Sequence, residues 1–259
     1  MKCPTCGFEN PKSYGLCQRC GRFLGAFTIP KPAEQPARPA TKEISYAARA
    51  REEYTHEEVA KRMKIQYVHG GHDPALRNLD GLLKLAASCR KKEINIKALS
   101  EEAARLIHDQ FRLRWVAIGS KNPRDGLFRY DALVGFREEA ANARRAQSFT
   151  LSDFVEDTKY KGRQISDISK MYFEEDKPYT DGAEITFNRP ILLKGKRRAP
   201  DEALEGDYLD VHIYGGDDEL IGWIETSGTV AGKLPDVTTI KTLELIASML
   251  GLAFMRAKH

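Results

Sequence analysis

Two copies of one short pattern, Cys-x-x-Cys-Gly, constrain the start of this chain more than any other feature. They are CPTCG at 3–7 and CQRCG at 17–21. Two intervening residues let both sulfurs of a pair turn toward one metal ion, and two such pairs complete a tetrahedron. A unit this small buries too little apolar surface to fold alone, so metal binding must supply about 10–16 kcal/mol of folding free energy. We predict one structural Zn²⁺ ion held by four thiolates: Cys3, Cys6, Cys17 and Cys20.

The alternatives for these cysteines are disulfides, a catalytic metal and redox chemistry. The N-terminal sequence MKCPTCGFEN lacks the basic and then apolar pattern of a secretory signal, so disulfides are not expected. Four cysteine ligands leave no open coordination position for catalysis. Redox chemistry of one pair stays open in principle, but the duplicated pattern favours metal. Gly7 and Gly21 follow the second cysteine of each pair, where a tight turn often requires a positive φ.

This N-terminal stretch resembles the short zinc ribbons at the ends of many prokaryotic, especially archaeal, proteins, which bind protein partners as often as nucleic acid. Residues 1–42 hold seven Lys or Arg and two acids, a net +5, whereas the whole chain is +4. Four thiolates around one Zn²⁺ lower the charge of this part to about +3. That is a weak footprint for nucleic acid, so we favour a protein adaptor and keep nucleic-acid binding as the alternative.

Composition and periodicity divide the chain into four parts. Residues 1–25 form the predicted ribbon. Residues 26–42 hold prolines at 30, 32, 36 and 39 without apolar periodicity, which is typical of a linker. A helical region is expected over 43–96 and the main domain over 97–259.

Four segments have apolar residues at helical spacing. The first is 43–68, with a capping box at Thr55–Glu58 where a new helix can begin, and the others are about 74–91, 97–112 and 236–257. We expect the last two to pack together on one face of a sheet, and Cys89 to be a buried, inert thiol. The expected inward stripes are Leu76, Leu79, Leu82, Leu83, Ala86 and Cys89; Leu99, Ala103, Leu106, Ile107 and Phe111; and Val237, Ile240, Leu243, Ala247, Leu250 and Phe254.

Segments with strand character lie between these helices, which predicts an α+β fold with an antiparallel sheet. A turn at 122–126 joins the first two strands, and a turn at 215–218 makes a hairpin of the last two. A short helix is expected over 137–146, and 147–180 shows no clear element. The predicted strands are 115–120, 127–136, 183–193, 208–215 and 220–228.

The two ends of 97–258 resemble a GAF domain. At the near end, the helix ALSEEAARLIHDQF runs into the strands WVAIGS and FRYDALVGF. At the far end, a strand and a short turn precede Ile221-Gly222-Trp223-Ile224, a Pro-Asp helix start and a helix rich in leucine and alanine. The resemblance implies a GAF-like antiparallel sheet flanked by N- and C-terminal helices. It also implies a sensory or interaction module that encloses a ligand between one sheet face and the segment 137–182.

The resemblance suggests an unidentified small-molecule ligand, although core packing explains each candidate residue equally well. A concave, mostly apolar site with few polar anchors suits the aromatic residues in the region. Bilin-binding and methionine sulfoxide-reducing members use cysteines here, and this chain has none after Cys89. The NKFDE-type signature of cyclic-nucleotide-binding members is absent as well. The candidate ligand-binding residues are Phe136, Tyr172, Phe173, Trp223 and Glu225.

The sequence carries no catalytic site residues that we recognise, so we expect a non-catalytic regulatory protein in signal transduction. P-loop, dinucleotide-binding, zincin and nucleophile-elbow patterns are all absent. The carboxylates of 153–184 are expected to be solvated loop charges. A nucleic-acid-binding transcriptional regulator is the first alternative, since Lys194, Lys196, Arg197 and Arg198 cluster, although acids follow them at once. An enzyme of unrecognised type is the second.

We also expect a cytoplasmic protein without a membrane span, because no run of eighteen apolar residues occurs. The helix over 74–91 carries more apolar positions than one packed face needs. Excess apolar surface is usually buried against another chain, and identical chains pair most simply about a two-fold axis. We therefore predict a homodimer built on helices within 43–112, with a monomer in which these leucines cover the sheet as the alternative.

Overall fold

The computed structural model describes residues 2–4, 7–10, 56–69, 74–156, 160–177 and 179–257. The chain divides into two compact units, Met1–Val59 and Ala60–His259. The second unit contains the sheet and nearly all of the described helices.

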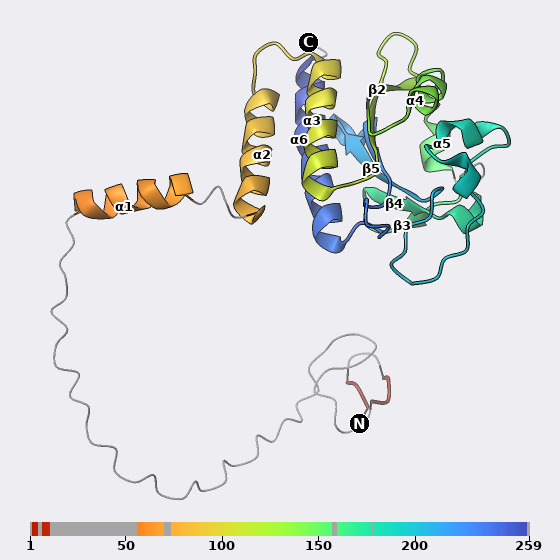
Figure 1. Ribbon diagram of the computed structural model, residues 1–259, viewed down its shortest axis with the longest axis horizontal. Helices are drawn as coiled ribbons and strands as arrows, with labels where there is room; N and C mark the ends of the chain where they lie inside the picture. The colour runs from red at the N-terminus through yellow and green to blue at the C-terminus, as the bar shows by residue number, and fades with distance from the viewer. Residues whose placement is uncertain are drawn as a thin grey trace, which may run out of the picture. The chain divides into compact units, whose positions relative to one another are not determined.

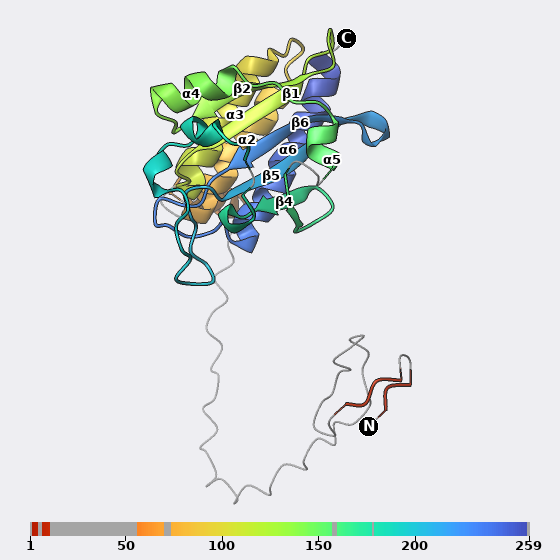
Figure 2. The same cartoon turned by 90° about the vertical axis from the view of Figure 1, so that its right-hand side faces the viewer.

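A single antiparallel sheet of six strands forms the centre of the second unit (Figures 1 and 2). Its strand order is β2-β1-β6-β5-β4-β3, so the two longest hairpins, β1–β2 and β5–β6, meet in the middle. The register pairs Ile118 of β1 with Ile224 of β6, and Ile224 with Val211 of β5. The strands are β1 (Val116–Lys121), β2 (Phe128–Val134), β3 (Arg163–Gln164), β4 (Ser169–Tyr172), β5 (Tyr208–Tyr214) and β6 (Leu220–Thr226).

Two helices, α3 (Ile96–Phe111) and α6 (Val237–Ala257), cover one face of this sheet, and α2 (Pro74–Cys89) packs on these two helices from the side away from the sheet. Between helices and sheet lies the main hydrophobic core, to which every one of these elements contributes. The predicted packing of 97–112 with 236–257 on one face is therefore confirmed. Because α2 shares this core through Leu85 and Cys89, the part of the helical region nearest the main domain is built into it.

The other face of the sheet is covered by short, irregular elements (Figure 2). Aromatic side chains form a second core there, centred on Phe128, Phe154 and Trp223. Both predicted turns between strands are confirmed. The Gly126 amide donates to the Asn122 carbonyl and Gly126 has φ +73°, and β5 and β6 form the expected hairpin. The covering elements are α4 (Glu138–Arg145), α5 (Ser152–Val155), and the 3₁₀ turns η2 (Glu174–Asp176), η3 (Ala183–Thr186) and η4 (Pro190–Leu192), while η5 (Gly216–Asp218) lies in the β5–β6 turn.

The predicted strand over 183–193 is wrong, because this segment forms the turns η3 and η4. Thr186 donates from Oγ1 to the Ala183 carbonyl at 2.7 Å, and Pro190 begins η4, where it cannot donate to a strand ladder. Asn188 bonds both the Arg137 amide and the Gly135 carbonyl instead. The missing sheet positions are filled by β3 and β4, which lie in the stretch for which no element was predicted.

Two inward stripes differ from expectation. In α2, Leu79 and Leu83 are 54% and 61% exposed, whereas Cys89 is buried as predicted and Leu85, which the predicted stripe left out, is buried with it. In α6, Val237 is 74% exposed, whereas the later positions of its predicted stripe are buried or half-buried. Leucines occur on more than one side of α2, so composition alone does not say which side faces α3 and α6. Burial raises the pKa of the Cys89 thiol, in keeping with an inert buried cysteine.

Two further helices bear on the predictions. α1 (His56–His69) begins next to the predicted capping box, while residues 43–55 lie outside the described part of the chain. α6 is long and apolar enough by composition to span a membrane. Its residues Leu243, Leu250 and Phe254 are nevertheless buried against the sheet, which is the arrangement of a core helix.

Candidate functional site

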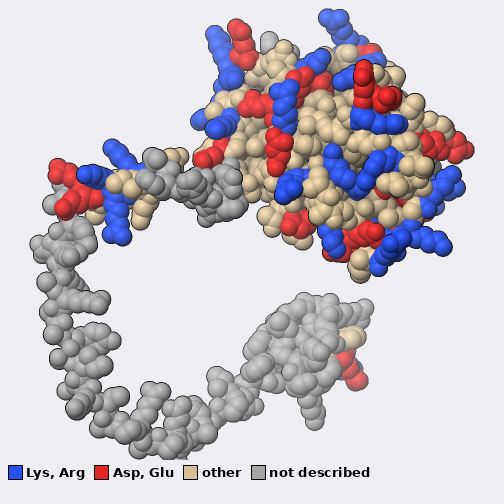
Figure 3. All heavy atoms as spheres, in the orientation of Figure 1, with Lys and Arg blue, Asp and Glu red and all other residues tan. Residues whose placement is uncertain are grey.

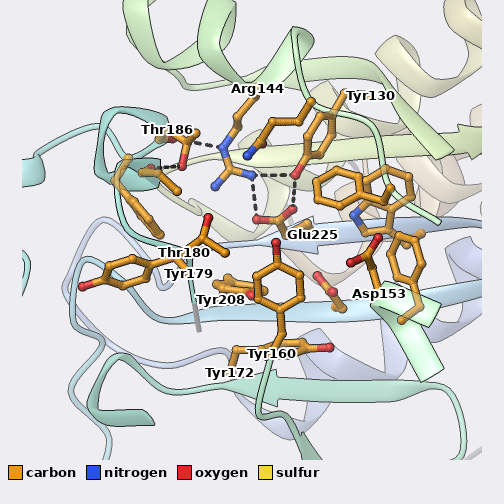
Figure 4. Close-up of a pocket in the computed structure, with 17 residues that line it drawn as sticks. Tyr130, Arg144, Asp153, Tyr160, Tyr172, Tyr179, Thr180, Thr186, Tyr208 and Glu225 are labelled. Atoms are coloured by element: carbon orange, nitrogen blue, oxygen red, sulfur yellow. Dashed lines mark hydrogen bonds and ion pairs between the residues drawn. The ribbon is translucent and has the colours of Figure 1, made fainter. Parts of the chain in front are cut away.

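A cavity of about 70 Å³ lies between the sheet and the irregular elements that cover its second face (Figure 4). Nine of its seventeen lining residues are aromatic, and four are charged. The segment from 144 to 187 supplies twelve of the seventeen, and the strands β2, β5 and β6 supply the other five. The lining residues are Tyr130, Arg144, Gln147, Phe149, Asp153, Phe154, Tyr160, Tyr172, Tyr179, Thr180, Ala183, Thr186, Phe187, Tyr208, Asp210, Trp223 and Glu225.

The floor of the cavity follows from strand alternation. In β5, Tyr208 and Asp210 face the cavity, whereas Leu209, Val211 and Ile213 belong to the core under the helices. The register places Asp210 directly opposite Glu225 of β6, and β4 sets Tyr172 opposite Tyr208. Polar and aromatic side chains of three neighbouring strands therefore meet at one place.

A buried ion pair connects α4 to this floor. Arg144 donates from Nη1 to Glu225 Oε1 at 2.7 Å, and the two side chains are only 4% and 6% exposed. Tyr130 completes a triangle, since its hydroxyl donates to Glu225 Oε2 at 2.7 Å and accepts from Arg144 Nη1 at 2.9 Å. Arg144 Nε also donates to the Thr186 carbonyl at 3.0 Å. One arginine thus ties α4, η3 and two strands together.

The electrostatics of this triangle are those of a satisfied buried pair. Burial alone would lower the pKa of the Arg144 guanidinium, but the charge of Glu225 raises it above its ordinary value. Aromatic rings surround the cation, with centroids of Trp115 and Phe136 at 4.7 and 4.8 Å from its central carbon. Burial, followed by the charge of Glu225, raises the pKa of Tyr130 well above its ordinary value. Arg144 therefore stays charged and the Tyr130 hydroxyl stays neutral.

Asp210 differs from the other charged residues of the floor. It is 5% exposed, and its Oδ1 atom makes no hydrogen bond to any residue in the described part of the chain. Burial, followed by the charge of Glu225, raises the pKa of its carboxyl well above the ordinary value, although Arg144 and Lys170 act in the opposite direction. The floor thus combines a satisfied carboxylate, Glu225, with an unsatisfied one beside it.

The aromatic walls are packed against one another. Tyr172 and Tyr208 are stacked, with ring centroids 4.6 Å apart and planes 15° apart. Trp223 contacts the rings of Phe149 and Phe154 at centroid distances of 5.7 and 5.1 Å. Figure 4 shows the hydroxyl groups of Tyr130 and Tyr160 pointing toward Glu225, whereas that of Tyr179 points away from it. The chemistry on offer is binding by ring faces and by fixed polar groups.

Three of the five predicted ligand-binding residues line this cavity: Tyr172, Trp223 and Glu225. The other two lie outside it. The Phe136 ring packs against the Trp115 ring in a tilted arrangement, with centroids 4.8 Å apart. The centroid of the Phe173 ring lies 5.1 Å from the central carbon of the Arg197 guanidinium. Sequence reasoning missed Arg144, Asp210 and the tyrosines of β2 and β5. The one available signal was the alternation in YLDVHIY, which sets polar residues on one side of β5.

The carboxylates expected to be solvated include one that is buried. Glu174 is 4% exposed and accepts hydrogen bonds from the amides of Gly195 and Gly206 at 2.7 and 2.6 Å. Asp207, fully buried, accepts from the Glu174 amide at 2.9 Å and from Arg197 at 3.0 Å. These acids hold the loop between η4 and β5 in place. Arg197 of the basic cluster is therefore engaged within the chain.

The N-terminal cysteines are described only in part. Cys3 is buried, its amide donates to the Phe8 carbonyl, and its carbonyl accepts from the Gly7 amide at 3.0 Å. Gly7 has φ +69°, as predicted for the residue after the second cysteine. This tight turn fits a Cys-x-x-Cys pair folded around a metal ion. Cys6, Cys17 and Cys20 lie outside the described residues, and no group of three or more metal ligands occurs among the rest.

No family model and no curated protein matches the chain. Solved structures that resemble it include the GAF domain of nlh2 from A. aeolicus in an inactive state, 11% identical, with a TM-score of 0.47 over 70% of this chain and 98% of that one. A GAF domain from Acinetobacter phosphoenolpyruvate-protein phosphotransferase is 14% identical, with a TM-score of 0.46 over 70% and 93%. Free methionine-R-sulfoxide reductase from Neisseria meningitidis, in complex with its substrate, is 12% identical, with a TM-score of 0.45 over 72% and 93%. At these identities and scores we rest no functional argument on the likeness.

Proposed function

We propose that this chain is a non-catalytic regulatory module in signal transduction, in which a GAF-like domain binds a small molecule and a zinc ribbon binds a partner protein. One observation carries the ligand-binding part: an aromatic cavity with a prebuilt polar floor of Arg144, Glu225 and Tyr130. A pocket that served packing alone would not need a buried charged triangle at its floor.

The position of the cavity adds support. It lies under the segment that follows the first β-hairpin, which is where the sequence resemblance to GAF domains implies a ligand. The lining residues also argue for binding over catalysis. Cysteine is absent from the lining, and the arginine and Glu225 satisfy each other, which leaves neither of them available as an acid or base.

The zinc part of the proposal rests on the paired Cys-x-x-Cys-Gly pattern and on the left-handed turn at Gly7. Four thiolates around Zn²⁺ would supply a folded surface to an otherwise short segment. We favour a protein over nucleic acid as its partner, and a cytoplasmic location. Figure 3 shows basic and acidic side chains interspersed on the visible face, which is not the pattern of an electrostatic footprint.

Native mass spectrometry of the gently purified full-length protein tests both parts. We expect one Zn²⁺ per chain and a co-purified small molecule that denaturation releases. The Cys3→Ser, Cys17→Ser double variant should lose the zinc and keep the small molecule, whereas Tyr172→Ala should do the reverse. Leu245→Ala, an exposed position on α6, serves as the matched control and should change neither. A wild-type protein without zinc would refute the ribbon.

Salt dependence separates the nucleic-acid alternative from this proposal. Binding through several phosphates weakens steeply as salt rises, because each contact releases condensed counterions. We expect no retention of the full-length protein on DNA or RNA at 150 mM salt. Retention with a steep salt slope, lost in the Cys3→Ser, Cys17→Ser variant, would instead assign the ribbon to nucleic acid.

A further inference from the structure

The cavity holds one feature that its packing does not explain. Asp210 lines it with a carboxylate that is 5% exposed, and its Oδ1 atom accepts no hydrogen bond from the described residues. A buried polar group without a partner costs free energy, and a charged one costs more. Such a group is expected where a ligand supplies the missing partner.

The charges around Asp210 indicate the sign of that partner. The lining holds one base, Arg144, and three acids, Asp153, Asp210 and Glu225. Arg144 and Glu225 neutralise each other at 2.7 Å, and Asp153 accepts from the Thr150 amide at 2.8 Å, so Asp210 is the acid of the floor whose Oδ1 atom accepts nothing from the described residues. Lys170, the cross-strand neighbour of Asp210, is not among the lining residues, and its ammonium donates to the Phe154 carbonyl at 3.4 Å.

The walls of the cavity also favour a positively charged ligand. The faces of aromatic rings attract cations, and Tyr172, Tyr208 and Trp223 border the floor on both sides of Asp210. The molecule already uses this chemistry elsewhere, since Arg144 lies over the rings of Trp115, Tyr130 and Phe136, and Arg197 lies over the ring of Phe173.

The size of the cavity limits what can enter. Its volume of about 70 Å³ is roughly half that of the 150 Å³ cavity that holds benzene in another protein. A few non-hydrogen atoms therefore fit, either as a whole small molecule or as the head group of a larger one.

We propose that the cavity binds a small organic ammonium group, whose N–H donors bond the carboxylate of Asp210 while the aromatic walls enclose its carbon atoms. The inference rests on the proposed ligand-binding function and names its chemical class. Binding places a positive charge beside Asp210 and satisfies Oδ1.

Three probes of similar size and different charge test this inference: ethylammonium, ethanol and acetate. They are titrated into the full-length protein while the indole N–H signal of Trp223 is followed by NMR. For three non-hydrogen atoms at no more than about 1.5 kcal/mol each, the expected dissociation constant of ethylammonium is millimolar or weaker. We expect ethylammonium to bind at least tenfold more tightly than either of the other two.

Asp210→Asn keeps the shape of the side chain and removes its charge. We expect it to weaken ethylammonium binding at least tenfold and to leave the weak ethanol response unchanged. Asp109→Asn is the matched control, because the Asp109 side chain on α3 is 80% exposed on the helix-covered side. It should leave ethylammonium binding unchanged.

The outcomes separate this inference from the function beneath it. Absence of ethylammonium binding, tighter binding of acetate or ethanol, or unchanged binding in Asp210→Asn would each overturn the ammonium assignment. In those cases a co-purified neutral or anionic molecule in the native mass spectrum would still uphold ligand binding. Absence of both ethylammonium binding and a co-purified molecule would overturn the proposed function as well.

Discussion

Asp210 and His212 lie two residues apart on the same side of β5, and each is buried with a side-chain atom for which the described residues offer no hydrogen-bond partner. Their ionisation acts on stability in opposite directions. Burial raises the pKa of the Asp210 carboxyl, whereas burial, followed by the charge of Lys170, lowers the pKa of His212 to about 4. Both residues therefore keep their neutral forms beyond the usual range of pH.

Replacing Asp210 with asparagine is expected to stabilise the protein without ligand. The raised pKa means that the folded state holds its proton above pH 4, where the unfolded chain has lost it, so the contribution of Asp210 to stability falls as pH rises. Removing this buried, unsatisfied carboxyl also removes the cost of keeping it protonated, so the free energy of unfolding should rise by about 1 kcal/mol or more at pH 7. Urea unfolding at pH 5 and pH 8 measures this, and the gain should be larger at pH 8.

Asp109→Asn is again the control and should change the free energy of unfolding by less than about 0.5 kcal/mol. A loss of stability in Asp210→Asn at both pH values would show that the carboxylate supports the fold. The burial of Asp210 would then be explained by the fold and not by a ligand.

His212 predicts an acid-sensitive fold. Its depressed pKa means that the unfolded chain takes up a proton near pH 6.5 while the folded state takes it up only near pH 4. Stability from this residue is present above pH 6.5 and is lost as pH falls to about 4, by up to about 3 kcal/mol. The groups that surround it are Lys170 on β4, Phe154 on α5, and Tyr214 and Asp210 on β5. In His212→Gln the slope of unfolding free energy between pH 7 and pH 4.5 should be shallower than in the wild type, and an unchanged slope would contradict the prediction.

At the scale of elements, the covering segment is attached to the sheet chiefly through Arg144. Its guanidinium contacts Glu225 on β6, Tyr130 on β2 and Thr186 at the end of η3. Arg144→Met should therefore cost about 3–5 kcal/mol, because it leaves Glu225 charged and buried without its partner. Thermal unfolding gives the free-energy change, and hydrogen exchange should show faster opening of α4 and η3 than of α3.

A second substitution separates charge from packing at the same place. If burial of an unpaired Glu225 is the cause, the double variant Arg144→Met, Glu225→Gln should recover much of the lost stability. Additive losses in the double variant would instead assign the effect to packing of α4. Arg145→Met, the next residue along α4, is an exposed control that should change little.

The elements differed in how far the sequence could predict them. Apolar periodicity placed α3, α6 and the two hairpins, because their buried sides are strongly apolar. The same reasoning placed a strand at 183–193, where the local bond of Thr186 and the bonds between Asn188 and the distant residues Gly135 and Arg137 outweigh strand propensity. Sequence reasoning missed the cavity floor because Tyr208 and Asp210, as polar residues on one side of a strand, resemble a solvated face. Only tertiary structure shows that a distant segment covers them.

At the scale of the whole molecule, the homodimer stays a prediction, and α2 and α6 are the helices on which we expect it to form. Leu79 and Leu83 of α2 and Leu245 and Leu252 of α6 are all more than half exposed. Since these leucines are not needed by the core, Leu79→Asp, Leu83→Asp should dissociate a dimer and leave the fold intact. Sedimentation at micromolar concentration should show twice the chain mass of 29.2 kDa for the wild type and a single chain for the variant.

A wild-type protein that sediments as a single chain would refute the homodimer. Circular dichroism of the Leu79→Asp, Leu83→Asp variant provides the control for folding. Loss of structure in that variant would mean that the leucines serve the chain's own core, contrary to their exposure.

The alternation along β5 has one more consequence, for how a signal could leave the cavity. Tyr208 and Asp210 touch the cavity, while Leu209 and Val211 between them touch the core beneath α6. The wall that separates a bound molecule from the helices is therefore one backbone thick. If a ligand in the cavity displaced β5, the surface on which α6 packs would move with it, and no intermediate side chain would be needed. The same strand therefore lines the cavity with one side and supports the packing of α6 with the other.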